Sequence, residues 1–254
     1  MRIVIALCAM GMGCVTEPEV EVPGPREPYD MVKTKSIAGE LPVFGVDGDG
    51  AGGLWILYHA SWADEASVVR LDENGTKLAE HRWFASAPPS GIARDGDTLW
   101  ISDPGASFES PKTLTQIDGA TGATLRTVMH DEHEAIDIDV FGDELRLGTF
   151  DGRVVALDRT TTMEKWRGTL IGAPDGFTGT ARGLTTDDDG AMWVMSSGYW
   201  LEKYTPELAG AGVFRAAPFE GHHTTAFEVF LAWDGGLIAA TENQITWLAP
   251  RGGL

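Results

Sequence analysis

An internal repeat of about 46 residues constrains the fold of this chain more than any other feature of its sequence. In each copy an apolar strand and a Gly/Asp turn precede a second strand that opens on Leu-Trp or an equivalent pair. The second member of that pair is Trp55, Trp100, Arg146, Trp193 and Ile238, so the steps between copies are 45, 46, 47 and 45 residues. A period this regular indicates five copies of one supersecondary unit.

Each copy is predicted to hold four short β-strands joined by tight turns. A third alternating segment ends in turn residues at 69–75, 115–118, 155–158, 202–206 and 246–250, and a fourth segment follows at 77–84 and 124–129. No stretch shows helical periodicity. Four-stranded units of this period are typical of a β-propeller, in which stacked sheets bury both of their faces. The three tryptophans at one register are therefore expected to pack between blades.

The two ends of the repeat region predict how the ring closes. The fifth unit stops after its third strand, near Pro250, and the alternating segment 29–37 precedes the first unit without a unit of its own. We expect this segment to supply the outer strand of the last blade, which hides two strand edges. The predicted fold class is all-β: a five-bladed propeller of four-stranded blades over residues 29–254, closed by its N-terminal strand.

Composition excludes several classes of function. The chain is 43% hydrophobic and 22% charged, which is typical of a globular protein. Its 38 acidic and 19 basic residues give a net charge of −19, which argues against a nucleic-acid binder and against docking on anionic lipid. No run of 18 apolar residues predicts a transmembrane helix. The chain also lacks a Gly-x-Ser-x-Gly motif and a phosphate-binding glycine loop.

The N-terminus is interpreted as an export signal. Arg2 precedes a short apolar stretch that ends in Gly11-Met12-Gly13-Cys14, the layout of a secretory signal. This end resembles a bacterial lipobox. The resemblance implies a lipoprotein signal peptide over 1–13 and lipidation at Cys14, and Val15 after the cysteine favours the outer membrane.

The segment that follows supports the lipoprotein interpretation. Residues 14–28 are rich in Pro and Glu and are expected to be an extended tether. The chain would then be a bacterial outer-membrane lipoprotein that faces the periplasm or the cell surface. The alternative is an apolar first strand with two incidental cysteines, Cys8 and Cys14.

The repeat units resemble a broad group of known propellers. Residues 152–158 followed by 164–166 are similar to a PQQ-type repeat, and 90–96 followed by 99–103 are similar to an NHL unit. The resemblance covers the domain as architecture, in the NHL, SMP-30 and PQQ-repeat group. PQQ enzymes have eight blades, so no PQQ cofactor is implied.

Three segments are similar to the plant-type glutaminyl cyclotransferase family, which consists of five-bladed propellers that bacteria secrete. They are residues 58–61, 182–185 and 195–198. Other family motifs differ here: the Phe-Thr-Gln-Gly opening is replaced by residues 42–45, Glu-Gly by Ser90-Gly91, and Trp-Lys-Glu has no counterpart. No catalytic residue is therefore carried over from the family.

One face of the predicted propeller gathers the candidate ligand-binding residues. When the strands of a blade are lettered a to d from the axis outward, the d–a and b–c loops emerge together, and loops on a rigid scaffold often bind ligands. Aromatic and acidic side chains there suit a sugar or a cationic or aromatic peptide. The predicted ligand-binding residues are His59, Trp62, Asp103, Glu134, Asp151, Arg182, Tyr199, Trp200 and Glu228.

Histidines in the d–a loops raise the alternative of a metal site. Imidazoles and carboxylates together suit Zn²⁺, and the candidate ligands are His130, His133, His222 and His223. The alternative is an acidic, solvated loop with incidental histidines. Residues 47–50 and 187–190 look like calcium loops but lack the glutamate at the twelfth loop position, so we expect hairpin turns there. No cofactor is expected, with Zn²⁺ or Ca²⁺ as the alternative.

Charged residues near the starts of the inner strands are predicted to face the axis. Glu134 and Glu228 around Arg182 form a ring of opposite charges, in which low dielectric strengthens the pairing. Such a ring either plugs the channel or forms the floor of a ligand site, with His133 and His222 as metal ligands or proton carriers.

Two functions fit these observations. The first is a non-enzymatic, lipid-anchored propeller that binds an envelope protein or a glycan, contacts the membrane only through its lipid and binds no nucleic acid. The second is a secreted propeller enzyme, either a metal-dependent hydrolase or lyase or a relative of the glutaminyl cyclotransferases.

Overall fold

The computed structural model describes twelve segments of the chain. They are residues 29–36, 43–59, 65–84, 89–105, 110–130, 135–170, 180–196, 200–206, 210–215, 229–233, 236–241 and 244–250. The described residues form antiparallel strands. Among them there is no helix that is long and apolar enough to cross a membrane.

The strands are grouped into five four-stranded sheets. The first sheet holds β2 (Val43–Gly48), β3 (Leu54–His59), β4 (Glu65–Leu71) and β5 (Lys77–Phe84), and the second holds β6 (Gly91–Asp95), β7 (Thr98–Asp103), β8 (Lys112–Asp118) and β9 (Thr124–His130). The third holds β10 (Ala135–Phe141), β11 (Glu144–Thr149), β12 (Arg153–Asp158) and β13 (Glu164–Thr169), and the fourth holds β14 (Ala181–Thr186), β15 (Met192–Ser196), β16 (Trp200–Tyr204) and β17 (Gly210–Arg215). The fifth holds β18 (Val229–Trp233), β19 (Gly236–Thr241), β20 (Gln244–Pro250) and β1 (Tyr29–Ser36).

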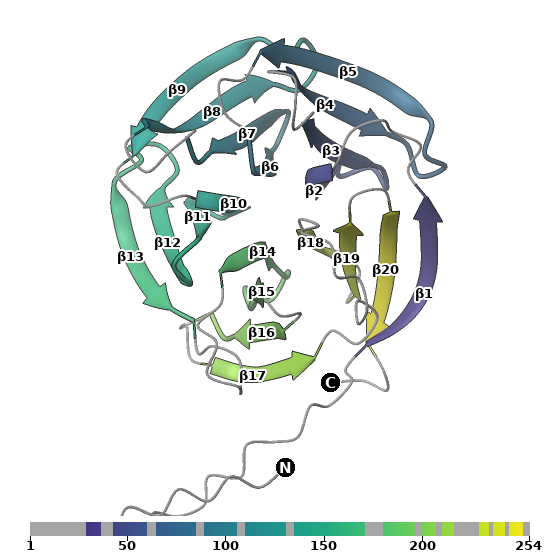
Figure 1. The fold of residues 1–254 in the computed structure, drawn as a ribbon, viewed down its shortest axis with the longest axis vertical. Helices are drawn as coiled ribbons and strands as arrows, with labels where there is room; N and C mark the ends of the chain where they lie inside the picture. Colours follow the sequence, from purple (N-terminus) through teal and green to yellow (C-terminus); the bar gives the residue numbers. More distant parts are fainter. Residues whose placement is uncertain are drawn as a thin grey trace, which may run out of the picture.

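The sheets are arranged radially around a common centre (Figure 1). The innermost strands β2, β6, β10, β14 and β18 contact one another in turn, and β18 contacts β2. This cyclic series of contacts makes a ring, so the prediction of an all-β propeller is confirmed. The number of sheets equals the number of sequence repeats.

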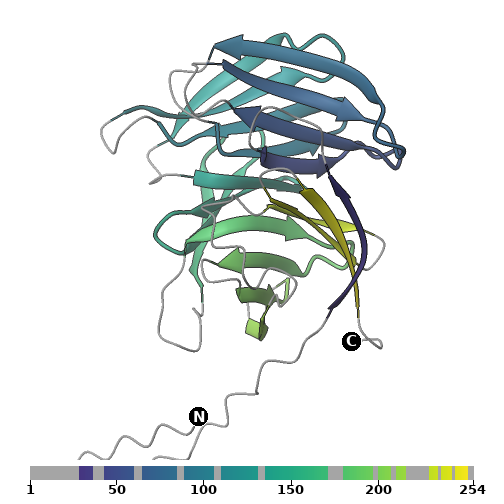
Figure 2. The same ribbon diagram turned by 45° about the vertical axis from the view of Figure 1, so that its right-hand side comes forward.

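The N-terminal strand closes the ring. β1 pairs antiparallel with β20, from Tyr29 opposite Pro250 to Ser36 opposite Gln244. Figures 1 and 2 show β1, in purple, alongside the yellow C-terminal strands. The prediction that segment 29–37 completes the last sheet is confirmed, with the strand ending at Ser36.

The core lies between neighbouring sheets, as the repeated tryptophans predict. Trp55, Trp100 and Trp193 are 5%, 0% and 4% exposed. Trp55 belongs to a cluster that combines residues of the first sheet with Ile92 and Leu99 of the second. Burying large aromatic side chains between sheets is a major source of stability in such a ring.

A cation covers each of the three tryptophan rings. The Arg70 guanidinium carbon lies 5.7 Å from the ring centroid of Trp55, the Arg126 guanidinium carbon lies 4.6 Å from that of Trp100, and Lys203 Nζ lies 4.5 Å from that of Trp193. A cation over an aromatic face is attracted by the ring quadrupole and adds to the stability from burial.

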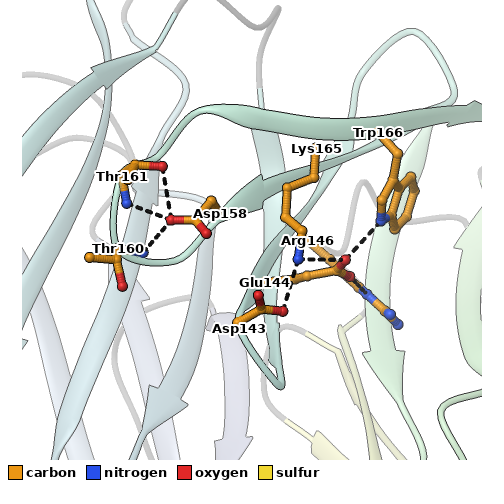
Figure 3. Close-up of polar contacts among 8 residues, drawn as sticks. All are labelled: Asp143, Glu144, Arg146, Asp158, Thr160, Thr161, Lys165 and Trp166. Carbon is orange, nitrogen blue, oxygen red and sulfur yellow. Dashed lines mark hydrogen bonds and ion pairs between the residues drawn. The ribbon is translucent and has the colours of Figure 1, made fainter.

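The third sheet departs from this pattern because Arg146 takes the tryptophan position. Arg146 is 5% exposed, and its Nε donates to Glu144 Oε2 at 3.0 Å. Trp166, on the outer strand β13, supplies an indole whose Nε1 donates to Glu144 Oε1 at 3.0 Å (Figure 3). Lys165 adds ion pairs to Glu144 at 3.4 Å and to Asp143 at 2.8 Å. The buried guanidinium is tolerated because Glu144 pairs with it, its Nη1 donates to the Thr186 hydroxyl at 2.9 Å, and it lies over the rings of Phe141 and Trp166.

The acidic segments that look like calcium loops are hairpin turns, as expected. Asp49 Oδ1 accepts the N–H groups of Ala51 and Gly53 at 2.7 and 2.8 Å. Asp187 Oδ1 accepts the Ala191 N–H at 2.8 Å. These carboxylates are therefore engaged by the backbone of their own turns.

Candidate functional site

The second strands of three sheets end on one face of the ring. β3 ends at His59, β7 ends at Asp103, and β11 leads into the turn 149–152. Antiparallel pairing with the third strand of each sheet puts these ends beside the following b–c connections. Together with Arg182, near the start of β14, the residues His59, Asp103, Phe150 and Asp151 define what we call the loop face.

His59 and Asp103 are the last residues of the second strands of the first two sheets. His59 is 4% exposed, and its ring meets that of Phe44 edge-on, with centroids 5.7 Å apart. Asp103 Oδ1 accepts the Gly105 N–H at 2.8 Å. Burial raises the pKa of the Asp103 carboxyl, and the Gly105 hydrogen bond and the charge of His59 oppose that rise. An imidazole whose charge acts on a carboxyl of raised pKa is a combination of groups that can hold and exchange a proton.

A rigid turn holds an aromatic ring out from the loop face. The Thr149 hydroxyl donates to Asp151 Oδ1 at 2.6 Å and accepts the Arg153 N–H at 3.0 Å. Gly152 adopts a φ of 74°, a backbone conformation that favours glycine. Phe150 lies within this turn and is 51% exposed.

Asp151 beside the exposed ring carries a negative charge. Partial burial acts to raise its pKa, but hydrogen bonds from Arg153 and Thr149 outweigh burial and hold the pKa below its usual value. An ion pair of 2.6 Å joins Asp151 Oδ2 to Arg153 Nη2. Asp151 was predicted for this face; Phe150 was missed, although an aromatic residue between two polar turn residues was an available signal.

Three carboxyl groups on the inner strands were also missed by sequence reasoning. They are Asp47 on β2 and Asp137 and Asp139 on β10, and each hydrogen-bonds to the inner strand of the next sheet around the ring. Asp47 Oδ2 accepts the Arg94 N–H, Asp137 Oδ2 accepts the Leu184 N–H at 2.7 Å, and Asp139 Oδ2 accepts the Thr186 hydroxyl at 2.5 Å. We call them the inner-strand carboxyls. They connect adjacent sheets near the centre of the ring.

The inner-strand carboxyls have strongly perturbed acidity. Burial raises the pKa of Asp47 to about 7, that of Asp139 to about 6 and that of Asp137 well above its usual value. The charge of Asp139 raises the pKa of the other two carboxyls further. The signal in the sequence was the alternation of apolar and acidic residues over 135–140, which places two acids on one face of a strand.

Two predicted site residues lie elsewhere than expected. The sequence predicts a d–a loop at His130, but His130 is the last residue of the outermost strand β9, opposite Lys112, because that strand runs one residue further than predicted. The sequence predicts a b–c loop at Trp200, but Trp200 is the first residue of β16, opposite Ser196.

The remaining predicted residues lie outside the described part of the chain. They are Cys14, Trp62, His133, Glu134, Tyr199, His222, His223 and Glu228. Arg182 is described and lies on the inner strand β14, but the two glutamates of its predicted charge ring are not. Among the described residues, no three His, Cys, Asp or Glu side chains are placed to hold a metal ion.

Comparison with known proteins shows the class of fold. No protein-family model and no curated protein matches the chain. The glutaminyl cyclase of Myxococcus xanthus superposes with a TM-score of 0.68 at 11% identity, over 89% of this chain and 98% of that one. The protein is thus similar in fold to a β-propeller enzyme across nearly all of that enzyme's length.

Two further solved structures are similar. A protein of unknown function from Bacteroides caccae has a TM-score of 0.55 at 14% identity, over 87% of this chain and 81% of that one. BamB from Moraxella catarrhalis has a TM-score of 0.44 at 15% identity, over 84% of this chain and 61% of that one. At these identities the likenesses concern the fold alone.

Proposed function

We propose that this protein is a lipid-anchored, five-bladed propeller of the bacterial envelope that binds a protein or a glycan through its loop face. The observation that carries the proposal is the loop face itself. Side chains from three separate sheets lie on it: His59 and Asp103, whose charges interact, at the ends of β3 and β7, and Phe150 within a fixed turn. A closed ring keeps such side chains in fixed positions, which reduces the entropy lost on binding.

Phe150 is the expected anchor of the interface. An aromatic side chain has few rotatable bonds, and the Thr149 hydrogen bonds already fix the backbone that carries it. Aromatic residues are enriched among the side chains that dominate binding energy at protein interfaces. The same ring would also stack on a sugar.

Attachment to the outer membrane is proposed to depend on Cys14. The proposed tether of residues 14–28 would separate the lipid from the propeller, with no other contact to the membrane. Palmitate labelling of the wild type and of Cys14→Ala tests this. Label and membrane association should be lost in the variant; membrane association that persists would contradict the proposal.

Partner binding is tested with the soluble domain that starts at Tyr29. The domain is immobilised, exposed to envelope extract and washed, and the captured protein or glycan is identified and titrated against each variant. Phe150→Ala should weaken its binding by about tenfold or more, as truncation of a central aromatic residue does. The matched control is Met163→Ala, since Met163 is 72% exposed in a turn on the opposite face. Equal binding by wild type and Phe150→Ala would contradict the role of the loop face.

A secreted enzyme is the second candidate, and one pair of residues favours it. His59 and Asp103 supply an imidazole and a carboxyl whose charges interact, on a scaffold that matches a glutaminyl cyclase over most of its length. Such an enzyme would cyclise an N-terminal glutamine and release ammonia. The measurement is ammonia release from a glutamine-initiated peptide, with and without added Zn²⁺, by the wild type and by Asp103→Asn. Activity that Asp103→Asn abolishes would favour the enzyme over the binding module, and a requirement for Zn²⁺ would favour a metal-dependent enzyme with His133 and His222 as candidate ligands.

A further inference from the structure

The outer strands of the described sheets differ in how their free edges are protected. On β5, Glu80 forms ion pairs with Lys77 and Arg82 at 2.5 Å each. On β13, Lys165 pairs with Asp143 at 2.8 Å, and Glu164 pairs with Arg167. Charged side chains on an edge strand oppose its pairing with strands of other molecules.

β9 has no such protection. Its sequence is Thr-Leu-Arg-Thr-Val-Met-His, without an acidic residue. Leu125 and Met129 are 53% and 71% exposed, and Thr127 between them is exposed on the same face. The outward face of β9 therefore carries two exposed apolar side chains with Thr127 between them, and no formal charge.

The one permanent charge of β9 is turned toward the ring. Arg126 Nη1 donates to the Thr160 carbonyl at 2.9 Å, Nη2 donates to the Arg159 carbonyl, and the guanidinium covers the Trp100 ring. These contacts fix Arg126 against the neighbouring sheet, so its charge does not lie on the outward face of β9 and does not oppose strand pairing there.

The backbone of β9 is paired on one edge. Its register with β8 runs from Thr124 opposite Ile117 to His130 opposite Lys112, and β9 is the last strand in the order of its sheet. Within the described residues, no strand pairs with its other edge. The N–H and C=O groups of such an edge can form main-chain hydrogen bonds with an added β-strand.

We propose that β9 is a docking site for an extended segment of a partner protein, which adds as a fifth strand to the second sheet. Leu125 and Met129 lie four residues apart, about 13 Å along the strand, and would contact apolar side chains at alternate positions of the added segment. The net charge of −19 favours a segment flanked by basic residues and opposes a second copy of this acidic chain. The site is on the perimeter of the ring and does not depend on the loop face.

The test uses the full chain and a fluorescein-labelled peptide, Lys-Val-Thr-Val-Thr-Val-Lys, as the probe. Binding is followed by fluorescence anisotropy. A second peptide, N-methylated at alternate residues, cannot make the edge hydrogen bonds. We expect the unmodified peptide to bind at least about tenfold more tightly than the N-methylated one. We also expect it to slow amide hydrogen exchange within β9.

Three variants separate strand addition from simple charge attraction. Leu125→Lys and Met129→Lys should each weaken binding about tenfold, whereas Met163→Lys, which adds the same charge at an exposed apolar residue off the strand, should not. Thermal melting verifies that all three fold.

Three results would overturn the proposal. These are no binding of the probe, equal binding of both peptides, or equal effects of all three lysine variants. A wild-type dimer that Leu125→Lys dissociates in sedimentation would show instead that a second copy occupies the strand. Failure here would leave the loop-face proposal unaffected, because Phe150 lies in a different sheet and on a different surface.

Discussion

Thr162 occupies a backbone conformation that its own side chain disfavours. Its φ is 59°, and it is the one residue other than glycine with a positive φ among the residues described. The equivalent turn of the second sheet has Gly122, with a φ of 72°. The two turns are otherwise alike: Asp118 Oδ1 and Asp158 Oδ1 each accept two backbone N–H groups and a threonine hydroxyl. Figure 3 shows the contacts of Asp158. A β-branched residue thus stands where the repeat elsewhere uses glycine.

Replacing Thr162 by glycine should therefore stabilise the protein. The left-handed conformation costs a side-chain-bearing residue about 1–2 kcal/mol, and part of that gain is offset by the greater freedom of glycine in the unfolded chain. We expect Thr162→Gly to raise the free energy of unfolding by about 0.5–1 kcal/mol, a rise in Tm of about 1–4 °C. Thr160→Gly, in the same turn without a positive φ, should not raise the Tm. A rise of equal size in both variants would contradict the strain assigned to Thr162.

At the scale of the element, β10 carries two carboxyl groups that couple folding to pH. Burial raises the pKa of Asp137 well above its usual value and that of Asp139 to about 6, and on β2 burial raises the pKa of Asp47 to about 7. In the unfolded chain all three titrate near pH 4. The folded protein therefore binds more protons than the unfolded chain between about pH 4 and 7, so stability contributed by these groups is full below about pH 4 and is lost as pH rises through that window.

This coupling predicts a higher Tm at pH 5.5 than at pH 8. Asp137→Asn should reduce the fall in Tm between pH 5.5 and pH 8. This variant should also melt above the wild type at pH 8, because an asparagine oxygen can still accept the Leu184 N–H without burying a charge. Asp189→Asn, at an exposed turn position, is the control and should leave the change in Tm between pH 5.5 and pH 8 unaltered. Carboxylates of lowered pKa, such as Asp72 and Asp158, act in the opposite sense only below about pH 5. A wild-type Tm that rises from pH 5.5 to 8 would contradict the account.

The elements also show what sequence could and could not predict. Strand β3 was predictable because an apolar run with tryptophan at a fixed register is a local signal. The inner-strand carboxyls were not, because β10 is buried only after β6 and β14 pack on either side of it, and that packing follows from ring closure. Gly91 illustrates this: a Cβ there would lie 2.7 Å from Asp137, a contact between sheets that no local pattern reveals.

The candidate site was likewise predictable in part: the positions of its residues on the ring followed from the sequence, and their side-chain surroundings did not. The loop face was expected to gather His59, Asp103 and Asp151, since strand order alone determines where b–c connections emerge. The interaction between the charges of His59 and Asp103 and the exposure of Phe150 depend on how the sheets pack, and neither follows from spacing.

At the scale of the whole molecule, one strand pair joins the two ends of the chain. β1 supplies the outer strand of a sheet whose other three strands are the last in the sequence. Without that pairing the outer edge of β20 would be unpaired and the fifth sheet would have three strands. The fixed geometry that we assign to the loop face depends on this closure, because each sheet is held by both of its neighbours.

The most direct test of the closed ring is a disulfide between β1 and β20. Thr34 lies opposite Thr246, and directly opposed residues of antiparallel strands have Cβ atoms close enough for such a bond. Both native cysteines, Cys8 and Cys14, precede Tyr29, so the domain that starts there is free of cysteine. Thr34→Cys and Thr246→Cys are introduced together, and Thr34→Cys alone is the control.

On oxidation, the double variant should form an intramolecular disulfide in the folded monomer. Because the bond closes a loop that spans most of the chain, it should stabilise the protein by up to about 4 kcal/mol relative to its reduced form. The measurement is the Tm of the oxidised and reduced double variant, together with the mass and oligomeric state of the oxidised species. A monomer that is cross-linked and melts at a higher temperature is the result we predict. Thiols that stay reduced, or disulfides that form only between molecules, would contradict a ring closed by its N-terminal strand.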